Sequence, residues 1–465
     1  MTQVRLTLGW IARAAGGRLF GGQADREVRE VVIDSRAAAA GDLFVAIRGP
    51  RFDGHDFVAE VLSRGAAAIV DSRSSGRPEP DGALIEVEDS VKALQDVAHA
   101  VRMASGTRVV AITGSAGKTT TKETIAAFLE RRYSVVKNKG NLNNHIGLPL
   151  SLLQTRDAPD VAVMELGMNH AGEISTLVAI AAPDVRVWTN VGDAHLGFFA
   201  SADAVADAKA EILERATRTA ILVCNADDPR VMTRAPLFAG RTVTFGTARG
   251  ADVRATDVHD RGLAGMSACV TTSAGERVIE TPLLGRGNLA NVLAATAVAL
   301  EFDIPLDDIA ESATQLQPAA RRGAVLRLAS GVTVVDDSYN SSPAALARAL
   351  EVIARERGAA RKIAVLGEML ELGDHAQRLH AESGRLAAAS GLDLLYAVGG
   401  APAQALAGAA VDAGMTAAAV TCFPTSDEAA AAIASTVRSG DLVLVKGSRG
   451  IRTDIVVDRL AAEHG

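Results

Sequence analysis

Residues 108–120 read RVVAITGSAGKTT, and this stretch decides the fold of the chain. From Arg108 to Thr113 the side chains are mostly β-branched or apolar, which predicts a buried strand. A glycine-rich turn follows, and the composition from Thr119 to Arg131 favours a helix. A strand that enters a helix through such a turn is typical of phosphate-binding sites, because successive backbone N–H groups can point at one anion.

The turn has the residues of a nucleotide-binding loop. The candidate phosphate-binding residues are Gly114, Ser115, Ala116, Gly117, Lys118, Thr119 and Thr120. Lys118 is expected to neutralise the β- and γ-phosphates of ATP, and the Thr119 hydroxyl is expected to ligate Mg²⁺. The strict Walker pattern has a glycine where this chain has Ile112, so the motif is a shortened variant, TGxxGKT. The alternative is a chance glycine-rich turn, which the lysine, the threonine and both flanking elements disfavour.

Further apolar runs lie outward from this motif. Val161 to Met164, Val185 to Asn190 and Ile221 to Cys224 are short runs, each of which ends at polar residues. Short buried strands that alternate with helices predict a parallel, doubly wound sheet. In such sheets ligands bind beyond the carboxyl ends of the strands, where these polar residues fall.

The chain divides into three predicted domains. Residues 1–83 have short β-like runs broken by glycine-rich turns and predict a small N-terminal α/β domain. Residues 84–318 form the predicted central P-loop domain, with the strand-like Leu84 to Val87 at its entry. Residues 319–465 alternate strand-like runs with alanine-rich helices and predict a Rossmann-like α/β domain.

Composition excludes several functional classes. The net charge is −7, so no overall basic field exists to hold nucleic acid. The chain has 3 cysteines and no CxxC pair, which argues against a disulfide framework. No apolar stretch reaches the roughly 20 residues that span a bilayer, and the N-terminus lacks the pattern of a signal peptide. A cytoplasmic location without a membrane span is expected.

Three other side chains are candidates for metal binding or catalysis. Glu165 ends an apolar strand, where a P-loop protein places a magnesium-binding carboxylate; the alternative is a surface glutamate. His195 is a lone histidine, and such residues are more often satisfied polar groups than ligands. Lys209 lies in a predicted helix, Ser201 to Leu213, among Ala, Asp and Glu, so from the residues alone it is interpreted as a solvated surface lysine.

Several motifs together resemble the Mur ligases in order and spacing, over essentially the whole chain. They are TGSAGKTT (113–120), GNLNNHIGLP (140–149), MELG (164–167), TNVGDAH (189–195), AKAEI (208–212), GNLAN (287–291), DDSYN (336–340) and KGSR (446–449). Within the family, DDSYN, GEMLELG (367–373) with His380, and the N-terminal GDLFVA (41–46) and FDGH (52–55) are most similar to the member that adds D-alanyl-D-alanine. The DNPR motif usual in the ligase that adds the third residue is absent.

The resemblance implies an ATP- and Mg²⁺-dependent ligase whose substrates are a UDP-MurNAc-tripeptide and D-Ala-D-Ala. Thr119 and Glu165 are implied to hold one Mg²⁺. His195 and Lys209 are implied to serve a second Mg²⁺, with Lys209 carbamylated, since this modification turns a cation into an oxygen-rich anion. The implied catalytic residues are Lys118, Glu165, His195, Lys209 and Arg322.

The resemblance also implies contacts to both substrates. Asn288 and Asn291 are implied to face adenine, and Asp337, with Tyr339 and Asn340, the ribose. An arginine at the start of the third domain is implied to reach the γ-phosphate, and Arg322 is preferred over Arg321. The residues implied to contact the UDP-sugar-peptide are Ser35, Arg36, Asn141, Asn143 and Asn144. The chain departs from the family pattern at Ser341-Ser342-Pro343, where Ala-Asn often follows the SYN segment.

Other functions stay open at this point. The third-residue ligase and folylpolyglutamate synthase are rivals of the same superfamily, although about a hundred residues before the phosphate loop argue against the folate enzyme. A P-loop kinase for a small molecule would turn over ATP without an amine. A nucleotide-binding scaffold without activity is disfavoured because Lys118, Thr119 and Glu165 are all present. We expect a monomer.

Overall fold

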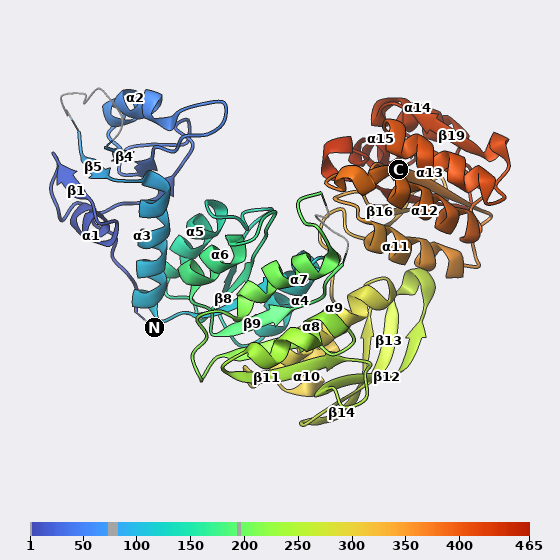
Figure 1. The fold of residues 1–465 in the computed structure, drawn as a ribbon, viewed down its shortest axis with the longest axis horizontal. Helices are drawn as coiled ribbons and strands as arrows, with labels where there is room; N and C mark the ends of the chain where they lie inside the picture. The colour runs from blue at the N-terminus through green and yellow to red at the C-terminus, as the bar shows by residue number, and fades with distance from the viewer. Residues whose placement is uncertain (1, 73–81, 193–196) are drawn as a thin grey trace. The chain divides into compact units, whose positions relative to one another are not determined.

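The structure is a computed structural model of the 465-residue chain, and it describes residues 2–72, 82–192 and 197–465. The chain separates into two compact units. The first comprises residues 1–112, 132–186 and 211–221, and the second comprises residues 113–131, 187–210 and 222–465. Figure 1 labels the helices and strands along the chain, which form three sheets in an α/β fold, as predicted.

The N-terminal sheet has five strands in the order β1-β5-β4-β3-β2, of which only β1 is antiparallel to its neighbour. Its elements are α1 (Leu8–Ala14), β1 (Arg18–Phe20), β2 (Val31–Val32), β3 (Leu43–Val45), η1 (Gly54–Phe57), α2 (Val58–Ser63), β4 (Ala67–Asp71) and β5 (Leu84–Val87). The predicted domain boundary placed β5 in the second domain. The strand pairs instead with β4 and β1, and Leu84 packs in the core of this sheet with Phe44 and Ala68.

The central sheet has nine strands in the order β14-β13-β12-β11-β10-β9-β6-β8-β7. Its strands are β6 (Arg108–Thr113), β7 (Val135–Lys137), β8 (Val161–Glu165), β9 (Val185–Trp188), β10 (Ile221–Asn225), β11 (Arg241–Gly246), β12 (Val253–Asp260), β13 (Met266–Thr272) and β14 (Gly275–Thr281). Strand β8 is parallel to both β6 and β7, and β11 is parallel to β12. The antiparallel pairs β12–β13 and β13–β14, which the sequence analysis did not include, extend the sheet.

Helices pack against this sheet in two sets. One set, whose members contact one another, is α3 (Ser90–Ser105), α5 (Gly147–Leu152) and α6 (Glu173–Ala181). The other is α4 (Lys118–Leu129), α9 (Gly285–Leu300) and α10 (Leu306–Thr314). The remaining elements are η2 (Leu153–Asp157), α7 (Ala202–Ala210), η3 (Glu211–Leu213), α8 (Pro229–Arg234), η4 (Ala235–Leu237) and η5 (Gly262–Ala264). These helices between strands agree with the predicted doubly wound arrangement.

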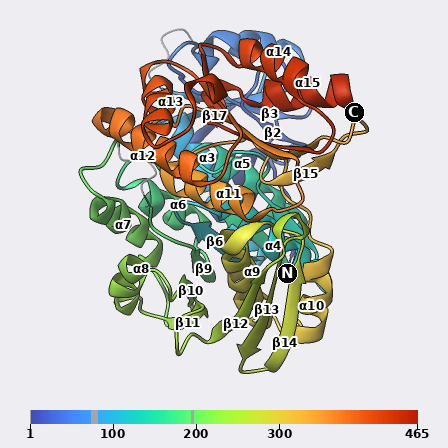
Figure 2. The ribbon, with the colours of Figure 1, turned by 90° about the vertical axis from the view of Figure 1, so that its right-hand side faces the viewer.

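The C-terminal sheet has six strands in the order β15-β16-β20-β17-β18-β19, and only β15 is antiparallel. Its elements, some of which are labelled in Figures 1 and 2, are β15 (Ala324–Arg327), β16 (Thr333–Asp337), α11 (Pro343–Arg355), β17 (Arg361–Gly367), η6 (Gly373–His375), α12 (Ala376–Ala389), β18 (Leu394–Val398), α13 (Ala401–Asp412), η7 (Ala417–Ala419), β19 (Val420–Phe423), α14 (Ser426–Thr436), β20 (Asp441–Lys446), η8 (Arg449–Ile451) and α15 (Asp454–His464).

Alternation along the strands builds two cores in this domain. In β20, Leu442 and Leu444 pack in the core that includes residues of α11, α12 and α13, whereas Val443 and Val445 pack in the core that includes residues of α14 and α15. Because successive strand residues point to opposite faces, a continuous apolar run covers both faces of the sheet. In the part of the chain that the structure describes, no helix is both long and apolar enough to cross a membrane.

Candidate active site

The phosphate loop begins where β6 ends and finishes at the N-terminus of α4. Two of its positions accept only glycine because of close approaches. A Cβ atom on Gly114 would lie 1.9 Å from the Thr189 hydroxyl oxygen. Gly117 has a φ of +82°, and a Cβ there would lie 2.2 Å from the side-chain oxygen of Asn291. The turn is therefore packed tightly between the end of β9 and helix α9.

Lys118 is the first residue of α4, and its Nζ donates a hydrogen bond to the Gly114 carbonyl at 2.9 Å. The residues Ser115 to Thr120 are half-buried. A lysine at this point can exchange the carbonyl for a phosphate oxygen when a nucleotide binds. The structure thus brings the predicted loop residues together in one turn whose helix N-terminus favours an anion.

Glu165 is the last residue of β8 and stands opposite Ile112 of β6 in the parallel ladder. It is only 4% exposed, so it is not a surface glutamate. Asn143 Nδ2 donates to the Glu165 carboxylate at 2.9 Å. The backbone of Glu165 is held by Asn138, whose Oδ1 accepts from its N–H and whose Nδ2 donates to its carbonyl. Sequence analysis missed Asn138, although its place directly after β7 was a signal.

The asparagine-rich segment after β7 divides by role. Asn143 contacts the Glu165 carboxylate, whereas it was predicted to contact substrate. Asn144 Oδ1 accepts from the N–H groups of Ile146 and Gly147, and so holds the start of α5. Asn141 is exposed. Among these three asparagines, the contacts with described residues give Asn143 and Asn144 positioning roles inside the protein.

Lys209 is buried in α7 with 1% of its surface exposed, which corrects the interpretation of a solvated lysine. It lies four residues after Val205 and three after Ala206, on the buried face of the helix. This spacing was the signal in the sequence. Burial lowers the pKa of Lys209 well below its ordinary value, and the charge of Lys118 lowers it further. His195 lies outside the described residues.

Asp337 at the end of β16 is paired with a second buried lysine. Lys446 at the end of β20 donates to the Asp337 carboxylate at 2.6 Å and to the Asn340 carbonyl at 3.0 Å. Tyr339 lies beside two cations, with the guanidinium carbon of Arg322 4.0 Å and that of Arg449 5.6 Å from its ring centroid. The predicted ribose-binding residues therefore cluster at the carboxyl ends of these two strands.

Arg321 and Arg322 have different surroundings. Arg321 has a φ of +60°, and its guanidinium donates to both oxygens of Asp458, at 2.9 and 3.0 Å. Arg322 stacks on the Tyr339 ring and has no ion pair with any described residue. Arg321 is held by a carboxylate and Arg322 is not, and the preference for Arg322 at the γ-phosphate stays a prediction.

Asn288 and Asn291 lie in the first turns of α9 and are joined by a hydrogen bond of 3.0 Å. The Asn291 oxygen also accepts from the Thr121 hydroxyl at 3.2 Å, and the residue is only 5% exposed. Asn291 is thus part of the wall behind Gly117. Asn291 thus lies beside the phosphate loop with Asn288 bonded to it, and its carboxamide makes contacts within the protein, while the adenine contact stays a prediction.

A cleft of about 270 Å³ lies next to the phosphate loop. Its lining residues are Ser115, Ala116, Asn190, Val191, Gly192, Asn225, Asp227, Asp228, Pro229, Arg230, Ser342, Ala344 and Arg348. Arg348 of α11 packs against Gly287, and burial lowers its pKa. Its guanidinium has no hydrogen bond or ion pair with the residues that the structure describes. Sequence analysis missed this cation because an arginine in an amphipathic helix normally faces solvent.

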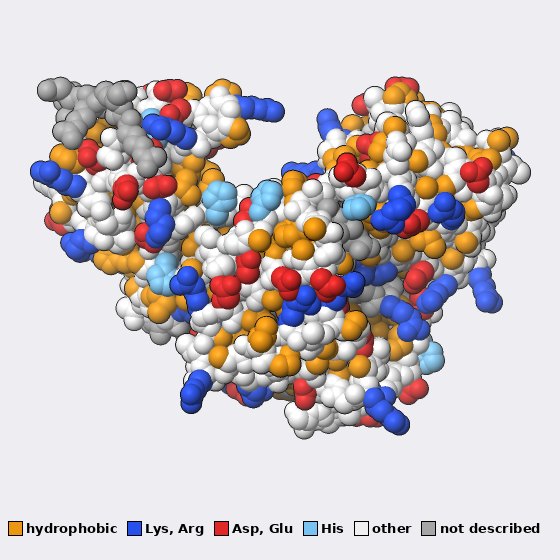
Figure 3. Space-filling model, viewed as in Figure 1, with side chains coloured by type: hydrophobic (Ala, Val, Ile, Leu, Met, Phe, Trp, Pro, Cys, Tyr) orange, Lys and Arg blue, Asp and Glu red, His pale blue; other side chains and the backbone are white. Residues whose placement is uncertain are grey.

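Ser35 and Arg36, predicted to contact the UDP-sugar-peptide, follow β2 in the N-terminal domain. The Arg36 guanidinium donates to the Asp34 carboxylate at 2.9 and 2.7 Å, and this bond lowers the pKa of Asp34 to about 2. The Ser35 carbonyl accepts from Arg64 at 3.0 Å. Charged side chains of both signs intermix on the face shown in Figure 3. No cluster of three or more His, Cys, Asp or Glu residues fit to hold a metal ion occurs in the ranges that the structure describes.

Comparisons with known proteins match the chain along most of its length. Family models match at residues 27–102 (Mur ligase family, catalytic domain), 112–299 (Mur ligase middle domain) and 321–449 (Mur ligase, glutamate ligase domain). The UDP-N-acetylmuramoyl-tripeptide--D-alanyl-D-alanine ligase of Bacillus subtilis is 33% identical over 458 residues, 98% of each chain.

Two solved structures are similar over nearly the whole fold. The MurF of Acinetobacter baumannii has a TM-score of 0.89 and 31% identity, and the match covers 99% of this chain and 100% of that one. The MurF ligase of Thermotoga maritima, solved in complex with ADP, has a TM-score of 0.82 and 32% identity, with 94% and 98% covered.

Proposed function

The chain belongs to the Mur ligase family, and we propose that it uses ATP to join the terminal carboxylate of a UDP-MurNAc-tripeptide to the amine of D-Ala-D-Ala. The observation that carries this proposal is the similarity over 98% of the chain to a ligase named for these two substrates. The phosphate loop, the buried Glu165 and the buried Lys209 support it, because they supply the anion-binding turn, the carboxylate and the amine that the proposed reaction uses.

The reaction has two steps. First, a carboxylate oxygen of the tripeptide bonds to the γ-phosphorus of ATP while the bond to the β–γ bridging oxygen breaks, which gives an acyl phosphate and ADP. The amine nitrogen of D-Ala-D-Ala then attacks the acyl carbon. Phosphate leaves, the nitrogen loses a proton, and the amide remains. Because the first step brings an anion against a polyanion, cations must offset the repulsion and the developing charge.

Two side chains of the described chain supply fixed positive charge. Lys118 at the N-terminus of α4 neutralises the β- and γ-phosphates after it leaves the Gly114 carbonyl. Arg322 supplies a second cation at the γ-phosphate, since its neighbour Arg321 is held by Asp458. Asp337 binds the ribose, with Lys446 fixing its carboxylate, while Asn288, Asn291, Tyr339 and Asn340 complete the nucleotide site.

The donor set fits magnesium, which prefers oxygen ligands. The Thr119 hydroxyl and the Glu165 carboxylate would hold one ion, and the Asn143 hydrogen bond orients that carboxylate for it. Bound there, magnesium would supply charge neutralisation between the phosphates and the attacking carboxylate. Ser35, Arg36, Asn141, Asn143 and Asn144 are the proposed contacts to the UDP-sugar-peptide.

Lys209 is the proposed site of carbamylation, and with His195 it would serve a second magnesium ion. Only an unprotonated amine reacts with carbon dioxide. Burial and the charge of Lys118 both lower the pKa of Lys209, so the amine loses its proton more readily than a surface lysine does. The carbamate would turn this position from a nitrogen base into an oxygen ligand.

Phosphate release tests the function. The purified chain is given ATP, UDP-MurNAc-tripeptide and D-Ala-D-Ala, and each substrate is then omitted in turn. We expect phosphate release only with all three, and a pentapeptide product by mass spectrometry. Release without any amine would indicate a kinase. Release with the dipeptide acceptor and a diamino acid, but not with the tripeptide, would indicate the third-residue ligase. No release in any mixture would refute the proposal.

A further inference from the structure

The turn of the phosphate loop is bonded to the segment that follows β9, and Asn190 makes three of these hydrogen bonds. The Ser115 N–H donates to the Asn190 carbonyl at 3.0 Å. The Ala116 N–H donates to Asn190 Oδ1 at 2.9 Å, and Asn190 Nδ2 donates to the Ala116 carbonyl at 3.0 Å. One carboxamide thus pairs with both polar backbone groups of one loop residue.

Neighbours of Asn190 add to this attachment. The Thr189 hydroxyl donates to the Ala116 carbonyl at 2.8 Å, and the Thr189 N–H donates to the Thr113 carbonyl at 3.0 Å. The Gly192 N–H donates to the Ser115 hydroxyl at 2.9 Å. Thr113, Ser115 and Ala116 are therefore each bonded to the segment of residues 189–192.

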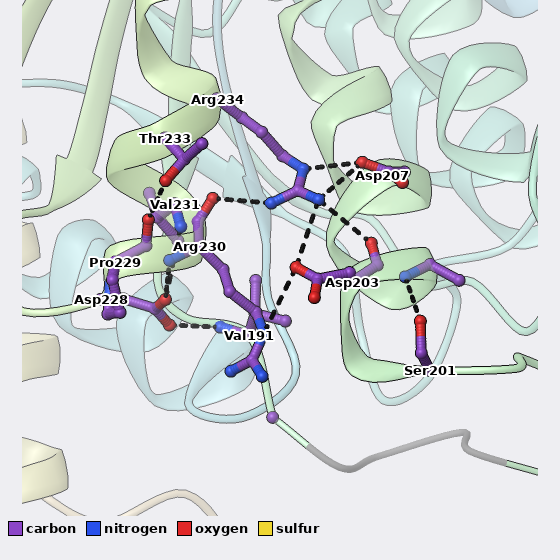
Figure 4. A network of polar contacts seen from close by, with 12 residues as sticks. Val191, Ser201, Asp203, Asp207, Asp228, Pro229, Arg230, Val231, Thr233 and Arg234 are labelled. Atoms are coloured by element: carbon purple, nitrogen blue, oxygen red, sulfur yellow. Dashed lines mark hydrogen bonds and ion pairs between the residues drawn. The ribbon is translucent and has the colours of Figure 1, made fainter.

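The segment that holds the loop is itself anchored on its far side. The Val191 N–H donates to the Asp228 carboxylate at 2.7 Å, and Asp228 also accepts from the N–H groups of Arg230 and Val231 at the start of α8, as Figure 4 shows. Asn225 Nδ2 donates to the Thr189 carbonyl at 2.9 Å. Asn190 is thus presented from a backbone that is bonded on both sides, and its position does not depend on the loop.

The bonds have a consequence for anion binding. In a phosphate loop, backbone N–H groups of the turn point at the anion. Here the N–H groups of Ser115 and Ala116 point at Asn190 instead. Binding of a phosphate therefore falls to the donors from Gly117 onward, at the N-terminus of α4, and to the Lys118 ammonium. The first half of the loop is structural and the second half binds.

We propose that Asn190 is the positioning residue of the phosphate loop, and that its paired bonds to Ala116 hold the shortened TGxxGKT turn in its binding conformation. The inference rests on the proposed use of ATP. Only a carboxamide both accepts from an N–H and donates to a carbonyl at this spacing, so neither a carboxylate nor an aliphatic side chain of similar size serves.

Binding of ADP and of adenosine by titration calorimetry tests the proposal on Asn190→Ala and Asn190→Asp. We expect Asn190→Ala to weaken ADP binding about tenfold, as for the loss of two ordinary hydrogen bonds, and to leave adenosine binding unchanged. Asn190→Asp keeps the volume and the acceptor for the Ala116 N–H, but loses the donor and adds a negative charge beside the phosphates. We expect it to bind ADP more weakly than Asn190→Ala, with the deficit reduced by salt.

Gln95→Ala is the matched control. Gln95 is a mostly buried carboxamide of α3 that donates to the His145 carbonyl at 3.0 Å. The control should lower the melting temperature as Asn190→Ala does, and should keep the wild-type affinity for ADP. Wild-type ADP affinity in both Asn190 variants would overturn the inference, as would an equal loss in Gln95→Ala. Failure of the wild-type chain to bind ADP would refute the proposed use of ATP instead.

Discussion

Two buried lysines, one beside the phosphate loop and one in the C-terminal domain, show how differently the same side chain can be used. Lys209 in α7 is 1% exposed, and among the described residues its only electrostatic neighbour is another cation, Lys118. Lys446 in β20 is 3% exposed but is bonded to the Asp337 carboxylate at 2.6 Å. Both lysines are almost fully buried, so the group beside each amine determines how the side chain can be used. A buried lysine with a carboxylate is a fixed cation, whereas one without a carboxylate is a reactive amine.

The largest effect should come from Lys209. Lys209→Met keeps the length of the side chain and removes the amine, and we expect kcat to fall on the order of 1000-fold because charge stabilisation at the phosphoryl group is lost. Phosphate release with all substrates measures it. Carbon dioxide-free buffer should reduce wild-type activity, and added bicarbonate should restore it. Wild-type turnover in Lys209→Met would remove the distinction between the two lysines.

The second effect separates the two adjacent arginines. Arg322→Met should lower kcat about 100-fold, since a single preorganised cation at the transferring phosphate is lost. Arg321→Met should leave kcat nearly unchanged, because Arg321 donates to Asp458. Steady-state kinetics with ATP varied measures both. If Arg321→Met were the slower variant, the assignment of the two arginines would have to be exchanged.

The third effect is on stability and compares the lysines directly. Lys446→Met leaves Asp337 without its buried partner, and we expect a loss of about 1–3 kcal/mol, reduced because the carboxylate is partly exposed. Lys209→Met should lose nothing, since it replaces a desolvated amine by an apolar side chain. Urea unfolding of both variants gives the two values. If both variants lost the same free energy of unfolding, the carboxylate beside Lys446 would not distinguish the two lysines.

A smaller effect is expected at the cleft beside the loop. Arg348→Met keeps the stem that packs on Gly287 and removes the charge, and we expect the Kd of ATP to rise about fivefold, as for one partly exposed charge contact. Arg355→Met on the same helix is the control, because Arg355 is bonded to Asp260 at 2.7 Å. Unchanged affinity in Arg348→Met would mean that this cation does not meet the nucleotide.

The smallest effect concerns a buried histidine of the C-terminal domain. His380 Nε2 accepts from the Met369 N–H at 2.9 Å, and burial lowers its pKa from 6.5. Between the lowered pKa of the folded chain and 6.5, His380 binds more protons in the unfolded chain than in the folded one. The free energy of unfolding therefore falls as the pH falls through this window, and the contribution of His380 is fully present above it. We expect less than about 1 kcal/mol. His380→Gln should flatten this part of the stability profile, measured by urea unfolding between pH 8 and pH 5.

Local patterns predicted the strands well but not every partner. Strand β6 has the predicted bounds, Arg108–Thr113, because β-branched runs and a glycine turn mark both ends. Strand β5 was assigned to the wrong sheet, since its own residues do not say which neighbour it pairs with. The antiparallel extension β12–β14 was not predicted; its strands are partly exposed and carry polar side chains on one face.

The residues of the candidate active site also divide into those that local sequence patterns predicted and those that they did not. Gly117, Lys118 and Glu165 could be identified because their chemistry is tied to the end of a strand. Lys209 was interpreted as solvated, since charged residues at neighbouring positions masked its place on the buried face with Val205. Asn138 and Arg348 were missed because each acts through a contact with a residue distant in the chain. Partners of this kind follow from the tertiary fold rather than from spacing.

The packing of Asn291 against Gly117 has a consequence for synthesis on the ribosome. The wall against which Gly117 packs is supplied by Asn291, which lies 174 positions further along the chain. A nascent chain that has emerged only as far as β14 contains every residue of the turn but lacks the wall behind it. We therefore expect the growing polypeptide to capture a nucleotide only after α9 has emerged, which nucleotide binding to ribosome-bound chains stopped before and after α9 would measure.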